Sequence, residues 1–142
     1  MAFPEAFREL ISQGAKMIIV PTFWGLEDCS EYGLKLNPLT EALFLKSMIT
    51  TRAYENTCAV VFVNAGADKS EESRWYAGLS QVGLPFVGGQ GSETKDTSAE
   101  GMSLVEVDME IVEEAEQNYR VRSDLAREGW HYLYRHTIRD DA

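Results

Sequence analysis

The chain of 142 residues is poor in cysteine, histidine and basic residues: it has two cysteines, two histidines and 13 lysines and arginines against 23 acidic residues. Two cysteines, Cys29 and Cys58, cannot build a disulfide framework and suit a reducing compartment. The formal net charge of −10 repels phosphate backbones and anionic lipids. These shortages argue against a disulfide-rich secreted domain, a nucleic-acid-binding module and a protein bound to a membrane surface.

Long hydrophobic runs are also missing. The longest apolar stretch, from Cys58 to Val63, is far too short to span a bilayer. No basic segment followed by an apolar core opens the chain, so no secretory signal is visible and we expect a cytoplasmic protein. What the chain does contain is 44% hydrophobic and 11% aromatic residues, which is enough to fill a core.

The start of the chain predicts a helix followed by a strand. Pro4 suits a first helical position and Gly14 follows the last apolar residue, so these two residues bracket a helix. One stripe of this helix is apolar and should be buried; it consists of Phe3, Phe7, Leu10 and Ile11. The apolar run from Met17 to Val20, closed by Pro21, is typical of a strand buried on both faces.

A second helix and strand continue this alternation. Residues 24–37 form a polar, glycine-containing loop that is long enough to be a lid or a pocket wall. Asn37 and Pro38 suit the N-cap and first position of a helix that runs to about Asn56, and the run from Thr57 to Val63 predicts another buried strand. The inner face of the helix is expected to hold Ala42, Leu45, Ile49 and Ala53. Strand, helix and strand in this order predict a parallel, right-handed βαβ unit.

Shorter elements follow Gly66. Residues 68–74 form a charged loop, residues 75–87 read as two short strands around Gly83-Leu84-Pro85, and residues 88–101 read as a hairpin connection. Residues 103–108 alternate well enough for an outer strand, and Asp108 suits the N-cap of a helix over residues 109–117.

Several short blocks, in order, resemble the carbon–nitrogen hydrolase (nitrilase/amidase) superfamily. Phe3-Pro4-Glu5-x-x-Arg8 matches the second half of the family pattern Cys-x-Asp-x-x-Phe-Pro-Glu-x-x-Arg. Thr51-Arg52-Ala53-Tyr54-Glu55-Asn56 is similar to the family's Arg-Ala-x-Glu-Asn at a helix end. The series ends with Val63-Asn64-Ala65-Gly66, then Gly78-Leu79-Ser80-Gln81-Val82-Gly83-Leu84-Pro85, which is close to Gly-x-Ser-x-Ile-x-x-Pro, and Val105-Glu106-Val107-Asp108. Each block is weak alone, whereas their common order and spacing are specific.

The resemblance implies an α/β fold, namely the C-terminal half of the nitrilase-type α-β-β-α sandwich: a βαβ unit followed by short, mostly antiparallel strands and a helix. It covers residues 1–122, which we expect to form a partial hydrolase domain. Residues 123–142 would then be a C-terminal extension, and Trp130, Tyr132 and Tyr134 would suit a role in homo-oligomerisation.

Intact members of the family hydrolyse nitriles, amides or carbamoyl groups with a Glu–Lys–Cys triad and without cofactor or metal. Glu is the general base, Lys holds the oxyanion and Cys attacks the carbon. By the family pattern the Cys would lie just ahead of Met1, and Glu and Lys further upstream. We therefore expect no triad residue in this chain, and a nitrile or amide substrate only if a missing N-terminal half completes the pocket.

The resemblance also implies supporting roles near the nucleophile. Residues expected to support the site are Phe3, Pro4, Glu5, Arg52, Glu55 and Asn64, and the expected pocket wall is Thr22, Phe23 and Trp24. A purely structural role competes with these interpretations, because Arg52, Glu55 and Asn56 at a helix end more often brace a fold. Asn64 at a strand end is more often a turn former.

Other reactive residues fit structural roles better than catalytic ones. Cys58 lies in an apolar strand, as an inert core thiol does, and the acidic neighbours of Cys29 disfavour a thiolate. His131 and His136 lack cysteine neighbours and fit solvated or subunit-contact positions better than a metal site. The glycine-rich run 88–91 lacks the features of a phosphate-binding loop and predicts a turn.

Three descriptions of the whole protein remain open. The chain could be a fragment of a longer hydrolase, or a non-catalytic half-domain that acts by association with another chain. It could also be a self-sufficient enzyme with other catalytic residues, which is the weakest alternative. A half-domain would expose one face of its sheet and would pair or aggregate through it.

Overall fold

A computed structural model describes residues 1–67, 75–91 and 101–127. Helix α1 (Pro4–Ser12) begins at Pro4, as predicted. Proline is well suited to this position because its backbone fixes φ and its missing N–H is not needed in the first turn. Phe7 and Ile11 bury the inner stripe of the helix, whereas Phe3 and Leu10 are exposed. The predicted helix is therefore confirmed, but only half of its apolar stripe faces the core.

Four strands form one mixed sheet in the order β1-β2-β3-β4. Strands β1 (Met17–Thr22) and β2 (Ala59–Asn64) are parallel, and helix α3 (Thr40–Asn56) connects them. Strands β3 (Gln81–Leu84) and β4 (Gly88–Gln90) continue the sheet in antiparallel fashion. This confirms the predicted parallel βαβ unit followed by short antiparallel strands.

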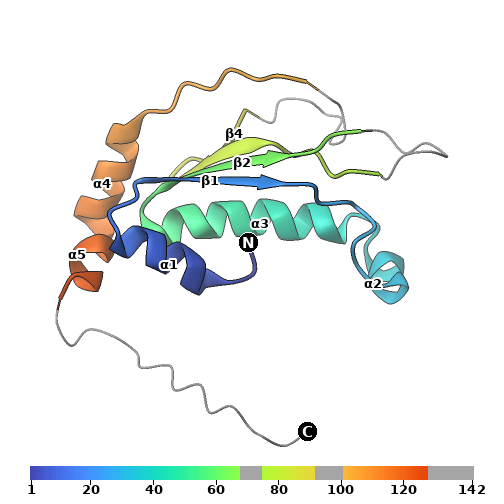
Figure 1. The fold of residues 1–142 in the computed structure, drawn as a ribbon, viewed down its shortest axis with the longest axis horizontal. Helices are drawn as coiled ribbons and strands as arrows, with labels where there is room; N and C mark the ends of the chain where they lie inside the picture. Colours follow the sequence, from blue (N-terminus) through green and yellow to red (C-terminus); the bar gives the residue numbers. More distant parts are fainter. Residues whose placement is uncertain (68–74, 92–100, 128–142) are drawn as a thin grey trace, which may run out of the picture.

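Helices α1 and α3 cover the same face of the sheet (Figure 1). The predicted inner face of α3 is confirmed, since Ala42, Leu45, Ile49 and Ala53 are all buried. They pack with the strand residues Ile18, Val60 and Phe62 in the main core. Gly83 of β3 allows α3 to approach closely, because a Cβ atom there would lie 2.7 Å from Cγ2 of Ile49.

The opposite face of the sheet is only partly covered. The segment before helix α4 (Met109–Tyr119) passes over it (Figure 1), and Val105 and Val107 of that segment pack against a second cluster built on β2, β3 and α4. The prediction of a strand at residues 103–108 is wrong: the segment forms no strand ladder. Among the described residues this cover contacts β2 and β3 and does not extend to β1.

Strand β1 is therefore not buried on both faces, which corrects the expectation from its apolar sequence. Ile18 faces the helices and is buried, whereas Ile19 on the other face is 64% exposed. Val63 at the end of β2 points to the same open face and is 47% exposed. A continuous apolar run predicts contact on both faces, and the described residues leave Ile19 and Val63 exposed on one of them.

The connection between β1 and α3 differs from the prediction. The expected loop contains helix α2 (Glu31–Leu36), whose N-cap Ser30 accepts a hydrogen bond from the Gly33 N–H. Helix α3 begins at Thr40 rather than at Pro38, because Asn37 forms a separate turn in which its side chain accepts from the Leu39 N–H.

Two further predictions concern the second half of the chain. Residues 75–87 contain one strand of the sheet rather than two, because residues 85–87 form the turn between β3 and β4. Asp108 caps α4, as predicted, by accepting a hydrogen bond from the Glu110 N–H at 2.9 Å. The chain then turns into the short helix α5 (Val121–Leu125).

Several expectations fall outside the described residues. These are the charged loop at 68–74, most of the hairpin connection at 88–101 and the tail residues Trp130, His131, Tyr132, Tyr134 and His136. In the part of the chain that the structure describes, no helix is long and apolar enough to cross a membrane.

Candidate functional site

The carboxyl ends of β1 and β2 meet at one edge of the sheet, and Asn64 lies at the centre of this edge. Its Oδ1 accepts hydrogen bonds from the Thr22 hydroxyl and the Trp24 N–H, both at 2.7 Å. Its Nδ2 donates to the Trp24 carbonyl at 3.1 Å. The parallel pairing of the strands brings Thr22 opposite Asn64, and the buried amide then fixes the backbone of residues 22–24.

Ser80 joins this cluster from the segment that enters β3. Its hydroxyl accepts from the Asn64 N–H at 3.0 Å and donates to the Asn64 carbonyl at 3.2 Å. Next to it, Trp24 accepts a hydrogen bond from the Ala77 N–H at 2.8 Å, and Gly25 forms a β-bridge with Tyr76. The loop after β1 is thus attached to two other parts of the chain.

Glu41 in the first turn of α3 completes the edge. The Trp24 indole Nε1 donates to its carboxylate at 2.5 Å, and the Trp24 ring lies 5.6 Å from the ring of Phe44. Glu41 is buried in the first turn of α3. We refer to Thr22, Trp24, Glu41, Asn64 and Ser80 as the strand-end cluster.

The strand-end cluster holds the backbone of the loop after β1 in place. Phe23 lies between two anchored residues but is 73% exposed, so its ring is presented to solvent from a fixed backbone. All three predicted wall residues, Thr22, Phe23 and Trp24, lie here together with Asn64. The sequence interpretation missed Glu41 and Ser80. Ser80 stood within one of the quoted blocks, whereas no pattern distinguished Glu41 from an exposed glutamate of a first helical turn.

Arg52 forms a second cluster near the other end of α3. Its Nε and Nη2 donate to the Met1 carbonyl at 3.1 and 2.9 Å, and Nη1 pairs with the Glu55 carboxylate. The guanidinium also lies 5.4 Å from the centre of the Phe7 ring. Arg52 is buried, so these contacts attach the first residues of the chain to α3.

Buried polar groups continue beneath Arg52. Asn56 is fully buried and donates to the Arg52 carbonyl at 2.9 Å, while its Oδ1 has no hydrogen-bond partner among the described residues. Cys58 lies against the same carbonyl, and burial raises the pKa of its thiol to about 12. Cys58 is therefore a protonated core thiol, as its sequence position predicts.

The predicted supporting residues divide between these two places. Arg52 and Glu55 lie together, whereas Asn64 belongs to the strand-end cluster. Arg52 and Glu41 are eleven residues apart on one helix, which corresponds to about 16 Å along its axis. Phe3 is 74% exposed and Glu5 is exposed as well, so neither is held by the Arg52 cluster.

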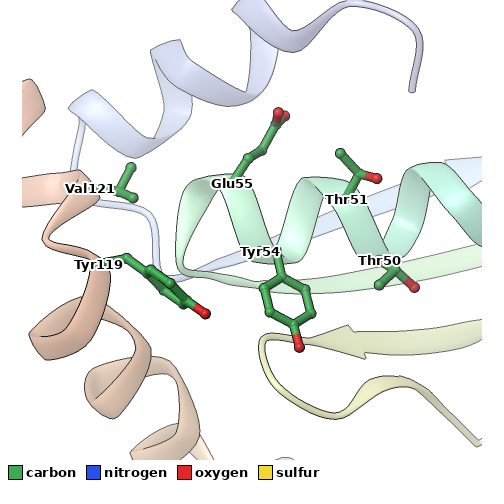
Figure 2. A pocket seen from close by; sticks show the side chains of 6 residues that line it. All are labelled: Thr50, Thr51, Tyr54, Glu55, Tyr119 and Val121. Carbon is green, nitrogen blue, oxygen red and sulfur yellow. The ribbon is translucent and has the colours of Figure 1, made fainter.

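An open pocket of about 570 Å³ lies on the outer side of α3, near the Arg52 cluster. Figure 2 shows its six lining residues: Thr50, Thr51, Tyr54 and Glu55 from α3, and Tyr119 and Val121 from the corner between α4 and α5. The rings of Tyr54 and Tyr119 both contact the ring of Phe86. The centroid of Phe86 lies 6.2 Å from that of Tyr54 and 5.8 Å from that of Tyr119. None of the predicted wall residues lines this pocket.

The described residues hold no arrangement that fits a metal or an activated nucleophile. They contain no group of three or more His, Cys, Asp or Glu side chains that could bind a metal ion. Cys29 is partly exposed, and its thiol donates only to the adjacent Ser30 carbonyl at 3.4 Å. The turn predicted at residues 88–91 is wrong, because these residues comprise the short strand β4 and the residue after it.

Comparison with known proteins identifies the fold. A carbon–nitrogen hydrolase from Helicobacter pylori G27 matches with a TM-score of 0.63 and 20% sequence identity over 86% of this chain and 42% of its own. The C. elegans NitFhit protein matches with a TM-score of 0.63 and 23% identity over 89% of this chain and 26% of its own. No protein-family model and no curated protein matches the sequence. The chain therefore has a nitrilase-type fold and spans less than half of either protein.

Proposed function

We propose that this chain, which has the fold of part of a carbon–nitrogen hydrolase domain, supplies the supporting half of such an active site and is inactive alone. In this proposal residues 1–122 form the partial domain. Hydrolysis of a nitrile, amide or carbamoyl bond would use a Glu–Lys–Cys triad provided by another polypeptide segment. The observation that carries the proposal is the strand-end cluster, which fixes an exposed wall residue, Phe23, and uses its own polar groups internally.

The contacts of the strand-end cluster support a structural role for its residues rather than a catalytic one. Asn64 uses both ends of its amide to hold residues 22–24, and Glu41 holds the Trp24 indole, so neither group is free to move a proton on a substrate. A hydrolase of this kind needs a thiolate, a base and an oxyanion donor. The described part of the chain offers one inert thiol, Cys58, and one partly exposed thiol, Cys29, which donates to the Ser30 carbonyl rather than to a base. Its role is therefore to shape and support a site.

The proposal is tested by measuring ammonia release from a panel of nitriles, amides and carbamoyl compounds with the purified 142-residue chain. We expect no turnover above the buffer control, while an intact carbon–nitrogen hydrolase measured in parallel gives a clear signal. Robust turnover that co-purifies with the chain would overturn the proposal. Sequencing the transcript upstream of Met1 for in-frame codons of a Cys-bearing strand would examine the source of the triad independently.

A second candidate function is a non-catalytic half-domain that acts by association with another chain. The exposed apolar residues on the open face of the sheet favour it, since Ile19 and Val63 lose water contact only when something covers them. Light scattering of the purified chain separates the two candidates in part: a clean monomer over a wide concentration range counts against association.

A further inference from the structure

The turn between β3 and β4 holds an aromatic residue in a backbone conformation that residues other than glycine rarely adopt. Phe86 has a φ of +64°, at the centre of a three-residue turn that is closed by a hydrogen bond of 2.7 Å between its two neighbours. Such a backbone costs energy and persists only where surrounding contacts hold it; strained residues of this kind are common at ligand sites. Here the Phe86 ring contacts Tyr54 of α3 and Tyr119 of α4. The strained turn therefore braces two tyrosines that belong to different helices.

The two braced tyrosines are walls of the open pocket on the outer side of α3 (Figure 2). Its volume of about 570 Å³ lies within the range of small-molecule sites. Besides Tyr54 and Tyr119, the lining consists of Val121, two threonines and Glu55. The pocket thus combines aromatic and aliphatic surface with a few polar groups, which is the usual composition of a small-molecule site.

Glu55 is the one charged residue of this lining, and it decides which polar group a ligand can carry. Its Oε1 pairs with the Arg52 guanidinium and lies 3.4 Å from the Asn56 amide nitrogen, whereas no hydrogen bond to Oε2 is formed among the described residues. An ionised carboxylate accepts hydrogen bonds and cannot donate them, so a ligand group that faces it must be a donor. The net charge of −10 attracts cations to the chain and repels anions.

We propose that this pocket binds a small aromatic amine in its protonated form, with the ring against Tyr54 and Tyr119 and the ammonium group toward Oε2 of Glu55. Aromatic rings attract one another and also attract cations through their faces, so the two tyrosines favour both parts of such a ligand. Arg52 already neutralises part of the Glu55 charge, so the rings supply most of the affinity and Glu55 supplies the preference for a cation. The inference goes beyond the proposed function, because the strand-end cluster contributes no residue to this pocket.

The proposal is tested by NMR titration of the isotope-labelled 142-residue chain with three probes of similar shape: phenethylammonium, phenethyl alcohol and hydrocinnamate. They carry the same ring and a cationic, a neutral or an anionic end. We expect phenethylammonium to bind with a Kd on the order of 1 mM, as suits a small ligand in an open pocket. Phenethyl alcohol should bind about threefold more weakly, because a partly exposed ion pair contributes little, and hydrocinnamate should not saturate the chain. The largest amide shifts should fall at residues 50–55 and 119–121.

Three variants separate the contributions of the ring and the charge. Tyr119→Leu keeps an apolar side chain and removes an aromatic face, so it should weaken phenethylammonium binding by about fivefold. Tyr32→Leu is the matched control, because Tyr32 lies on α2, is 72% exposed and does not line the pocket. It should leave the Kd unchanged. Glu55→Gln should abolish the preference for the cation and retain binding of the alcohol, which also reports that the variant folds.

Four results would each overturn the proposal. The first is no saturable shift with phenethylammonium up to about 20 mM, a concentration far above the expected Kd. The second is equal or tighter binding of hydrocinnamate. The third is a Kd that Tyr119→Leu leaves unchanged or that Tyr32→Leu weakens equally, and the fourth is a preference for the cation that survives Glu55→Gln. These measurements record binding without hydrolysis, so they succeed or fail independently of the proposed function.

Discussion

Replacing Asn64 with alanine should destabilise the chain through the strand-end cluster. The side chain makes three hydrogen bonds, from the Thr22 hydroxyl, from the Trp24 N–H and to the Trp24 carbonyl, at 2.7 to 3.1 Å. At about 1 kcal/mol for each bond, the expected loss in the free energy of unfolding is about 3 kcal/mol. The estimate is large for one side chain because the Thr22 and Trp24 groups lose their partner in a partly buried site.

The assay is urea denaturation followed by circular dichroism and tryptophan fluorescence, with the free energy taken from the linear dependence on urea. Thr22→Val is the matched control: it removes one bond and keeps the shape, so we expect a loss of about 1 kcal/mol. Asn64→Asp keeps the acceptor and loses the donor, and should fall between the two. A loss below about 0.5 kcal/mol for Asn64→Ala would refute the view that this amide holds residues 22–24 in place.

Three further predictions concern other contacts. Burial tends to raise the pKa of Glu116, but hydrogen bonds from the Arg122 N–H, the Thr57 hydroxyl and the Ser123 N–H outweigh it and hold the pKa at about 2. Its contribution to stability is therefore present above the ordinary pKa of 4.5 and is lost as the pH falls toward 2, and Glu116→Gln should flatten that part of a pH–stability profile. Arg52→Lys should cost about 2 kcal/mol and speed aminopeptidase removal of the first residues, because two hydrogen bonds to the Met1 carbonyl are lost; unchanged cleavage would contradict this. Gly83→Ala should cost about 1 to 3 kcal/mol by collision with Ile49, whereas Gly101→Ala, with nothing within 4 Å, should be near neutral in the same denaturation assay.

The parts of the fold that sequence predicted well are those with strong local signals. Pro4 and Asp108 mark helix starts by their backbone chemistry, and the spacing of Ala42, Leu45, Ile49 and Ala53 identifies the buried face of α3. The parallel pairing of β1 and β2 follows from a long helix between two short apolar runs.

The errors arise where distant contacts decide the outcome. An apolar strand looks the same whether its second face is covered or open, so Ile19 was predicted to be buried and is exposed. Residues 103–108 alternate as a strand does, yet they pack on the sheet face instead of joining its ladder. Asn37 is of a residue type that often caps helices, but its side chain stabilises a turn before the helix.

The candidate site was predictable in its residues and less so in its arrangement. The quoted blocks contain Arg52, Glu55, Asn64 and Ser80, but their spacing in sequence does not reveal that they separate into two clusters. Glu41 carries no sequence signal, because only the position of the Trp24 indole gives its carboxylate a partner.

The central claim is that the chain has the supporting half of a nitrilase-type site without its own triad chemistry. The most direct measurement is the intact mass of the chain, together with ammonia release, after incubation with nitriles and amides. The account predicts an unmodified mass and no ammonia above the buffer control. An acyl adduct on Cys29 or Cys58 that forms and turns over with ammonia release would contradict it.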